Sequence, residues 1–235
     1  MRQYVGSCLL SLLILVASTP MHADTKGEQL LHRAERIAQQ TQTVEAVLLR
    51  SDSPITGTLR MKKPSIILLN FPDANGKKSV IASQGRHLVS VEEASNSGNV
   101  MDYEELYDFA NISATILYLT YLLEPGQLRS FVHPTFAGAY QRDNVTYQVV
   151  KCPPSFGRSA TTFYIGQSGL LEGIEMEAIK STNTTAPAQK LWVRDLRLNV
   201  PLTPQQCAYT PPATVHITTD KENPYHDFLP VGATA

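Results

Sequence analysis

The sequence lacks the residue patterns that commonly build a catalytic or metal-binding site. None of its three cysteines lies in a C-x-x-C arrangement, and its six histidines form no pair such as H-x-x-x-H. Ser168 stands in the segment G-Q-S-G-L, which departs from the G-x-S-x-G nucleophile elbow and is typical of a hairpin turn. We therefore expect no catalytic residue, no metal and no cofactor. The alternative is a pair of carboxylates acting as acid and base, although Asp102, Glu104 and Glu105 are more typical of a charged first helical turn.

The sequence also lacks an excess of either charge. Lys and Arg number 20 against 21 Asp and Glu, which gives a formal net charge of −1. A nucleic-acid-binding surface normally needs a basic excess, so nucleic acid is not expected as a partner. Hydrophobic residues make up 43% of the chain and charged residues 17%, a composition typical of a globular domain.

The apolar run near the start of the chain is too short to cross a bilayer comfortably as a helix, which takes about 20 residues. This run, Val5–Ala17, follows a short cationic start at Arg2 and precedes Pro20 and Ala23. The order is typical of a secretory signal peptide, so we expect residues 1–23 to be cleaved after Ala23 and the mature chain to be exported. An uncleaved N-terminal anchor is the alternative.

Two cysteines remain in the expected mature chain, Cys152 and Cys207. An oxidising compartment would favour a disulfide between them. The bridge would close a loop of about 55 residues and stabilise the fold by about 3 to 4 kcal/mol in the chain-entropy model. Two separate buried thiols are the alternative.

Short strand-like segments, separated by Pro, Gly and Asn, fill most of the mature chain. An amphipathic helix is predicted first, over residues 26–41, with Leu31, Ala34 and Ala38 on one face. Strands are predicted over residues 44–49, 55–61, 65–71, 78–83, 87–91, 137–142, 145–151, 161–165, 170–180 and 190–200. This order predicts an α+β fold built on an antiparallel sheet.

Two segments are apolar on more than one side. Residues 66–71 predict a strand that is apolar on both faces, which an antiparallel sheet explains only if both faces are covered. Residues 102–128 predict a helix that is apolar nearly all round and stops at Pro125-Gly126. Tyr118 and Tyr121 in this helix suit a boundary between water and an apolar pocket.

Three motifs follow one another along the chain, Gly57–Pro64 (GTLRMKKP), Ser83–Leu88 (SQGRHL) and Tyr209–Pro212 (YTPP). They resemble the strand-and-turn, hairpin and terminal motifs of the LolA-like periplasmic carriers of outer-membrane lipoproteins and of a related family of periplasmic proteins of unknown function. The resemblance implies a strongly curved, incomplete antiparallel β-barrel wrapped around helices that act as a lid over an apolar cavity. We accordingly place one domain at residues 24–212, its helical lid insertion at 102–130 and a C-terminal tail at 213–235.

In these carriers the cavity holds the acyl chains of a lipoprotein. The resemblance therefore implies a periplasmic carrier or binding protein for a lipid, an acylated lipoprotein or another long apolar ligand. By position, the strand after the basic-Pro turn faces the cavity. The predicted ligand-binding residues are Ile67, Leu69, Phe71, Val89, Val91, Ile116, Leu119 and Leu123. Plain core packing under the lid is the alternative for these side chains.

The resemblance also bears on partners. Lys63 takes the place of an arginine that hydrogen-bonds the lid loops in the carriers, so it is expected as a lid contact, although lysine cannot make a forked contact.

The alternative function is a sensor or regulatory interaction module of the same fold that binds a membrane-anchored protein of the envelope. We expect a monomer. An enzyme acting on envelope lipids is a third hypothesis, which predicts histidines and carboxylates converging on the cavity.

Overall fold

The computed structural model describes residues 25–51, 56–84, 87–104, 106, 110, 113–124, 126–155, 158–180 and 185–218. The predicted signal peptide, residues 219–235 of the predicted tail and part of the predicted lid insertion lie outside the described residues. Within the described ranges, no helix is long and apolar enough to cross a membrane.

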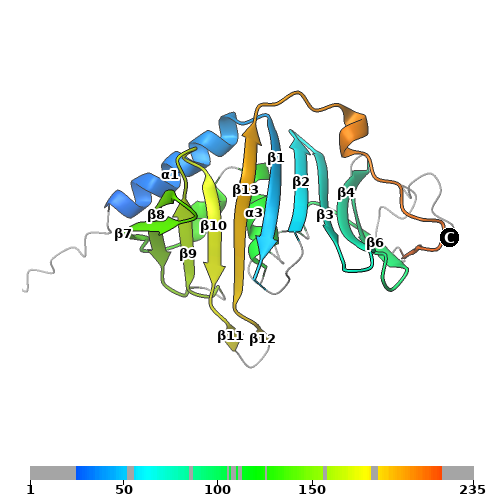
Figure 1. The fold of residues 1–235 in the computed structure, drawn as a ribbon. Helices are drawn as coiled ribbons and strands as arrows, with labels where there is room; N and C mark the ends of the chain where they lie inside the picture. The colour runs from blue at the N-terminus through cyan, green and yellow to red at the C-terminus, as the bar shows by residue number, and fades with distance from the viewer. Residues whose placement is uncertain are drawn as a thin grey trace, which may run out of the picture.

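Twelve strands form one open sheet (Figure 1). Their order along the sheet is β14-β6-β5-β4-β3-β2-β1-β13-β10-β9-β8-β7, and neighbours are antiparallel except for β14 and β6. The strands are β1 (Thr43–Arg50), β2 (Thr56–Lys62), β3 (Ile66–Pro72), β4 (Lys78–Gln84), β5 (His87–Glu92), β6 (Ser97–Met101), β7 (Thr135–Arg142), β8 (Val145–Cys152), β9 (Thr161–Ile165), β10 (Leu171–Met176), β13 (Gln189–Leu198) and β14 (His216–Thr218). A separate pair joins β11 (Ile179–Lys180) to β12 (Thr185–Ala186).

Strand β1 joins the two halves of the sheet. It pairs with β2 on one side and with β13 on the other, so the N-terminal meander and the C-terminal strands form one surface. The predicted half-barrel, an open antiparallel sheet combined with helices, is therefore the observed architecture.

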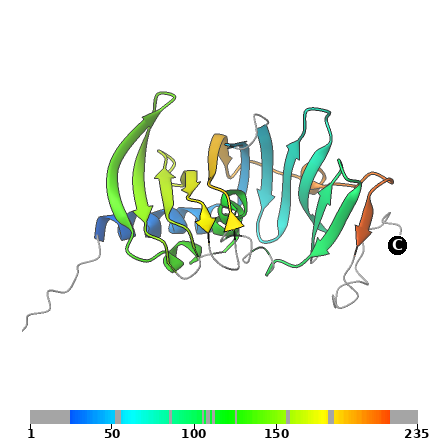
Figure 2. The same cartoon turned by 90° about the horizontal axis from the view of Figure 1, so that it is seen from below.

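The helices α1 (Thr25–Gln40) and α3 (Ala114–Leu123) lie on one face of this sheet, which we call the inner face, over the part that contains β7, β8, β10 and β13 (Figure 2). Helix α1 packs against β7 and β8, and helix α3 packs against α1, β10 and β13. Helix α1 is amphipathic as predicted, and its buried Leu31, Ala34 and Ala38 point into the fold. The opposite face is called the outer face.

Strand β3 has both faces covered, as its sequence predicts. Ile67 and Leu69 are buried on the inner face, whereas Leu68 between them packs against an outer-face cluster. That cluster consists of Val80, Ala82, Val89, Val91, Val100, Val215 and Ile217. A strand with two buried faces is apolar at consecutive positions, which explains the run at residues 66–71.

The predicted C-terminal tail, residues 213–235, begins inside the folded domain, because residues up to Thr218 still belong to the sheet. Val215 and Ile217 are buried against the outer face, and β14 pairs in parallel with β6. A short 3₁₀ helix, η2 (Pro204–Cys207), precedes this segment and packs against β2 and β3.

The predicted helix over residues 102–128 is not continuous in the described residues: 106 and 110 are helical, but 102–104 are not, and Ser113 has extended backbone. Strand β6 extends to Met101, and α3 begins only at Ala114, because the Ser113 side chain accepts the N–H of Ile116 at 3.4 Å as an N-cap. After α3 the chain turns at Gly126, whose φ of 96° suits glycine, and enters the 3₁₀ helix η1 (Gln127–Ser130).

The predicted disulfide is not formed, because Cys152 and Cys207 are free and buried in different places. Cys152 ends β8 in the inner-face core, and Cys207 belongs to η2 beside β2 and β3. Four strands separate β2 from β8, a path of about 24 Å along the sheet at the usual strand spacing. A disulfide needs its Cα atoms within about 7 Å. Burial raises the pKa of the Cys152 thiol to about 12, which keeps it protonated.

Candidate functional site

The candidate site is the apolar layer between the inner face and the two helices. Ile67 and Leu69 of β3 and Leu119 of α3 are buried in this layer, at 0%, 3% and 1% exposure. Phe71, Ile116 and Leu123 pack against it while remaining partly accessible. The structure therefore brings six of the eight predicted ligand-binding residues into one cluster, which we call the inner cluster.

The two remaining predicted residues, Val89 and Val91, lie on the outer face. They are buried in the cluster that Val215 and Ile217 cover, whereas their neighbour Leu88 points to the inner face. Successive side chains of a strand alternate between faces. Because both faces of β5 are covered, alternation alone could not tell from the sequence which apolar residues face the helices.

Helix α3 forms an apolar roof over part of the inner face. Eight of its ten residues are buried, and its surface is apolar nearly all round, as the sequence predicts. Its polar contact with α1 is made by Tyr121, whose hydroxyl donates to the backbone oxygen of Ala34 at 2.9 Å. The hydroxyl of the neighbouring Tyr118 is fully buried and has no hydrogen-bond partner among the described residues. Burial raises the pKa of both phenols, so both stay neutral.

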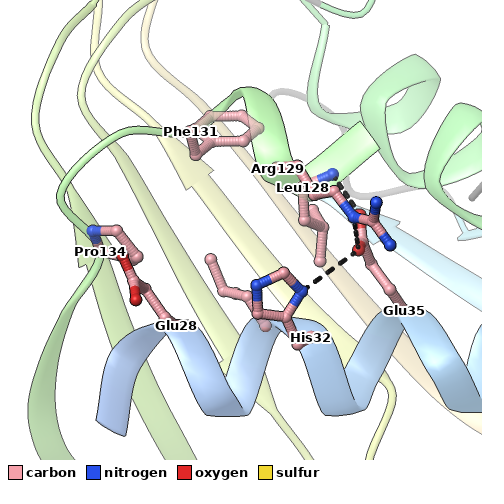
Figure 3. A pocket seen from close by; sticks show the side chains of 8 residues that line it. Glu28, His32, Glu35, Leu128, Arg129, Phe131 and Pro134 are labelled. Carbon is pink, nitrogen blue, oxygen red and sulfur yellow. Dashed lines mark hydrogen bonds and ion pairs between the residues drawn. The ribbon is translucent and has the colours of Figure 1, made fainter. Parts of the chain in front are cut away.

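A buried carboxylate holds the end of the roof to α1 (Figure 3). Glu35 of α1 is 3% exposed, and its Oε1 accepts the N–H of Leu128 in η1 at 2.8 Å. Its Oε2 lies 3.4 Å from Nε of Arg129 and 3.9 Å from Nδ1 of His32. Because η1 follows α3 closely in the chain, this carboxylate connects α1 to the end of the roof.

A pocket of about 220 Å³ opens beside Glu35 (Figure 3). Its polar rim consists of Glu28, His32, Glu35 and Arg129, and its apolar floor of Leu31, Leu128, Phe131 and Pro134. Leu31, Leu128 and Phe131 also belong to the inner cluster. The pocket floor is thus continuous with the apolar layer beneath the helices.

No family model and no curated protein sequence matches this chain. An uncharacterized conserved protein from Thermus thermophilus has a similar solved structure, with a TM-score of 0.54 at 10% identity over 83% of this chain and 99% of that chain. The Mycobacterium tuberculosis lipoprotein LppX gives a TM-score of 0.49 at 12% identity over 77% and 98%. A LolA superfamily protein from Nitrosomonas europaea gives 0.34 at 12% identity over 78% and 97%. The open antiparallel sheet, its inner helices and its helical insertion match the predicted architecture. The chain shares its fold with the Thermus protein, and this architecture is the one that the resemblance to LolA-like proteins predicts.

The basic-Pro turn after β2 contacts α1. The predicted lid contact Lys63 donates from Nζ to the backbone oxygen of Ala38 at 2.6 Å, near the end of α1. The contact to the insertion is made instead by Tyr103, whose hydroxyl donates to the Ser65 oxygen at 2.6 Å and lies 3.0 Å from the Ser83 hydroxyl. Burial lowers the pKa of Lys63.

The two buried tyrosines of the α3 roof predict stability changes of opposite sign. Tyr118→Phe removes a hydroxyl that has no partner among the described residues, so we expect the free energy of unfolding to rise by up to about 1 kcal/mol. Tyr121→Phe removes a satisfied hydrogen bond, so we expect it to fall by about 1 kcal/mol. Urea denaturation of the two variants, each differing from the parent by one oxygen, measures both changes. An equal loss in Tyr118→Phe would indicate that a buried water serves its hydroxyl.

Sequence reasoning missed Glu35 and Tyr103, although each carried a signal. Glu35 lies four residues after Leu31 and one after Ala34, so it falls beside the apolar face of α1. A carboxylate beside the buried face of a helix needs a hydrogen-bond or charge partner, so the position of Glu35 could have predicted a contact with another element. Tyr103 lies within an apolar pattern, so its ring was predicted to pack in the core and its hydroxyl contacts with Ser65 and Ser83 were not predicted.

Proposed function

We propose that this chain is a periplasmic carrier or binding protein that holds a lipid, an acylated lipoprotein or another long apolar ligand between the inner face and α3. The observation that carries the proposal is the roof itself. Helix α3 is apolar nearly all round and, among the described residues, is tied to α1 by one tyrosine hydrogen bond and, through η1, by Glu35. A roof held mainly by apolar packing is replaceable by an apolar ligand that supplies equivalent contacts.

The free energy of replacing the packing of α3 against the sheet by contacts with an acyl chain supports the proposal. Burying an acyl chain gains about 0.8 kcal/mol per methylene, so a long chain offsets the loss of packing between α3 and the sheet. In the described residues the inner cluster is filled by its own side chains, with Ile67 at 0% exposure and Leu69 at 3%. Ligand entry therefore requires the roof to move, and no catalytic step takes part.

Uptake of a fluorescent fatty acid by delipidated protein tests the proposal. Ile116→Glu places a carboxylate on a partly accessible position of the roof, and we expect at least about tenfold weaker uptake, because a charge is costly against an acyl chain. Val145→Glu is the matched control, since Val145 is a partly accessible apolar residue that packs in an outer-face cluster.

Two results would count against the carrier. If Ile116→Glu and the parent take up the probe equally, the roof does not contact the ligand. If the parent takes up no probe and mass spectrometry finds no lipid co-purifying with it, the carrier function is rejected.

The second candidate is an interaction module that binds a membrane-anchored protein, and an aromatic cluster on the outer face favours it. Tyr140 is 43% exposed and lies over Tyr164 and Trp192, with ring centroids 5.4 and 6.2 Å away. The guanidinium of Arg142 lies 4.2 Å from the Trp192 ring centroid. If this function is correct, a pull-down returns one envelope protein, and Tyr140→Ala weakens its capture while fatty-acid uptake is unchanged.

A further inference from the structure

Three buried polar atoms without partners gather in the loop between β8 and β9. They are the Ser155 hydroxyl, Nη1 of Arg158 and the Ser159 hydroxyl, none of which has a hydrogen-bond partner among the described residues. Buried polar groups are nearly always satisfied in folded proteins, and an unsatisfied one requires an explanation. Two of the three, on Ser155 and Arg158, lie directly opposite each other in the loop, which indicates a shared cause.

The backbone places Ser155 and Arg158 on one side of this loop. Each residue's N–H donates to the other's carbonyl, Ser155 N to Arg158 O at 3.3 Å and Arg158 N to Ser155 O at 2.8 Å, and the two form an isolated antiparallel bridge. Directly opposed residues of such a bridge project their side chains to the same side, with Cβ atoms about 4.5 to 5.5 Å apart. The two side chains therefore leave the backbone on the same side of the loop.

Arg158 lies against the inner cluster. Its guanidinium carbon is 4.8 Å from the ring centroid of Phe131, and that ring meets Phe163 edge to face at 4.9 Å. Both phenylalanines belong to the inner cluster, and Phe131 also lines the pocket beside Glu35. The Arg158 guanidinium, which can donate hydrogen bonds to an anion, therefore lies at the edge of the inner cluster.

The charge of Arg158 is not neutralised by the described residues around it. No described carboxylate forms an ion pair with it, whereas Arg129 and Arg142 each have one. Burial lowers the pKa of Arg158, and no neighbouring negative charge among the described residues offsets this change. A partly buried guanidinium offers planar, paired donors that match a carboxylate or a phosphate.

We propose that Arg158 and Ser155 form the binding site for the anionic head group, carboxylate or phosphate, of an amphiphilic ligand whose alkyl chain lies in the inner cluster. This inference rests on the proposed carrier function and names its ligand class. The head group accepts hydrogen bonds from the Arg158 guanidinium and the Ser155 hydroxyl, and the chain runs past Phe131 and Phe163. Ser159, the next residue along the chain, is not part of the site.

Binding of ligands with one chain length and different head groups tests the inference. We expect the parent protein to bind a long-chain fatty acid and an alkyl phosphate about tenfold more tightly than the methyl ester of the acid. Arg158→Gln should abolish this preference while leaving the affinity for the ester unchanged. Ser155→Ala should reduce the preference in part. Inorganic phosphate should not displace the fatty acid, because it lacks the chain.

Arg142→Gln is the matched control, because Arg142 also stacks on an aromatic ring but on the outer face. It should keep the full preference for anionic heads. Thermal unfolding of ligand-free Arg158→Gln shows whether the variant is folded, and Arg158→Met serves as a second uncharged variant.

The outcomes separate this inference from the carrier function. Equal binding of acid and ester by the parent overturns the head-group site and leaves the carrier standing. The same holds if Arg158→Gln retains the preference, or if inorganic phosphate displaces the acid. Failure of every amphiphile, the ester included, overturns the carrier and the head-group site together.

Discussion

Leu69→Glu is expected to prevent folding. Leu69 is 3% exposed in the inner cluster, between the cross-strand neighbours Leu59 and Ile81, so a carboxylate there would be buried among apolar side chains. The expected loss exceeds about 4 kcal/mol, a large part of the roughly 5 to 15 kcal/mol that stabilises a typical domain. Far-UV circular dichroism and urea denaturation measure the effect.

Leu69→Met is the control, because it conserves volume and should cost less than about 1.5 kcal/mol. The pair of variants also reports on the state of the inner face without ligand. A Leu69→Glu protein that folds with nearly the stability of the parent would mean that water reaches this position, as in an open cavity, rather than packed side chains.

Glu35→Ala is expected to lower the free energy of unfolding by about 2 to 3 kcal/mol. The substitution leaves the buried N–H of Leu128 without its charged acceptor and frees η1 from α1. Because η1 closely follows α3, the same variant should take up a fluorescent fatty acid faster than the parent. Urea denaturation and stopped-flow uptake measure the two effects.

Glu35→Gln separates the hydrogen bond from the charge. Its side-chain oxygen can still accept the Leu128 N–H, and what is lost is the negative charge that faces Arg129 and His32. The Arg129 side chain is 64% exposed, so this loss should stay below about 1 kcal/mol. Equal destabilisation by Gln and Ala would show that the charge, and not the hydrogen bond, holds η1.

Strands bounded by strong turn residues were predictable from the sequence. Asp143 and Asn144 both adopt positive φ, 50° and 63°, and they join β7 to β8 where the sequence places a hairpin. By contrast, β6 has only two large apolar residues, Val100 and Met101, and β14 is recognisable only through its pairing with β6. Pairing partners far apart in sequence leave no local pattern.

The apolar character of the site was predictable, but its geometry was not. Ile67 and Leu69, on the strand that follows the Lys63-Pro64 turn, lie in the inner cluster, and their contact with a ligand stays a prediction. Val89 could not be assigned to a face, since apolar residues continue on both sides of β5. The start of α3 was missed because the Ser113 cap lies inside an otherwise helical pattern, and only its hydrogen bond to Ile116 identifies it.

The open sheet has two free ends, and the chain protects both from strand addition by another molecule. At one end, β14 is only three residues long. At the other, β7 is interrupted by a bulge between Phe136 and Ala139, where Gly138 has a φ of 94°, and the Lys26 ammonium lies 3.5 Å from the Phe136 ring centroid. Short, bulged and charged edges are how β proteins avoid aggregation through their edges. An open sheet with apolar layers on both faces can thus stay monomeric, because neither of its end strands offers a long, regular edge to a second copy.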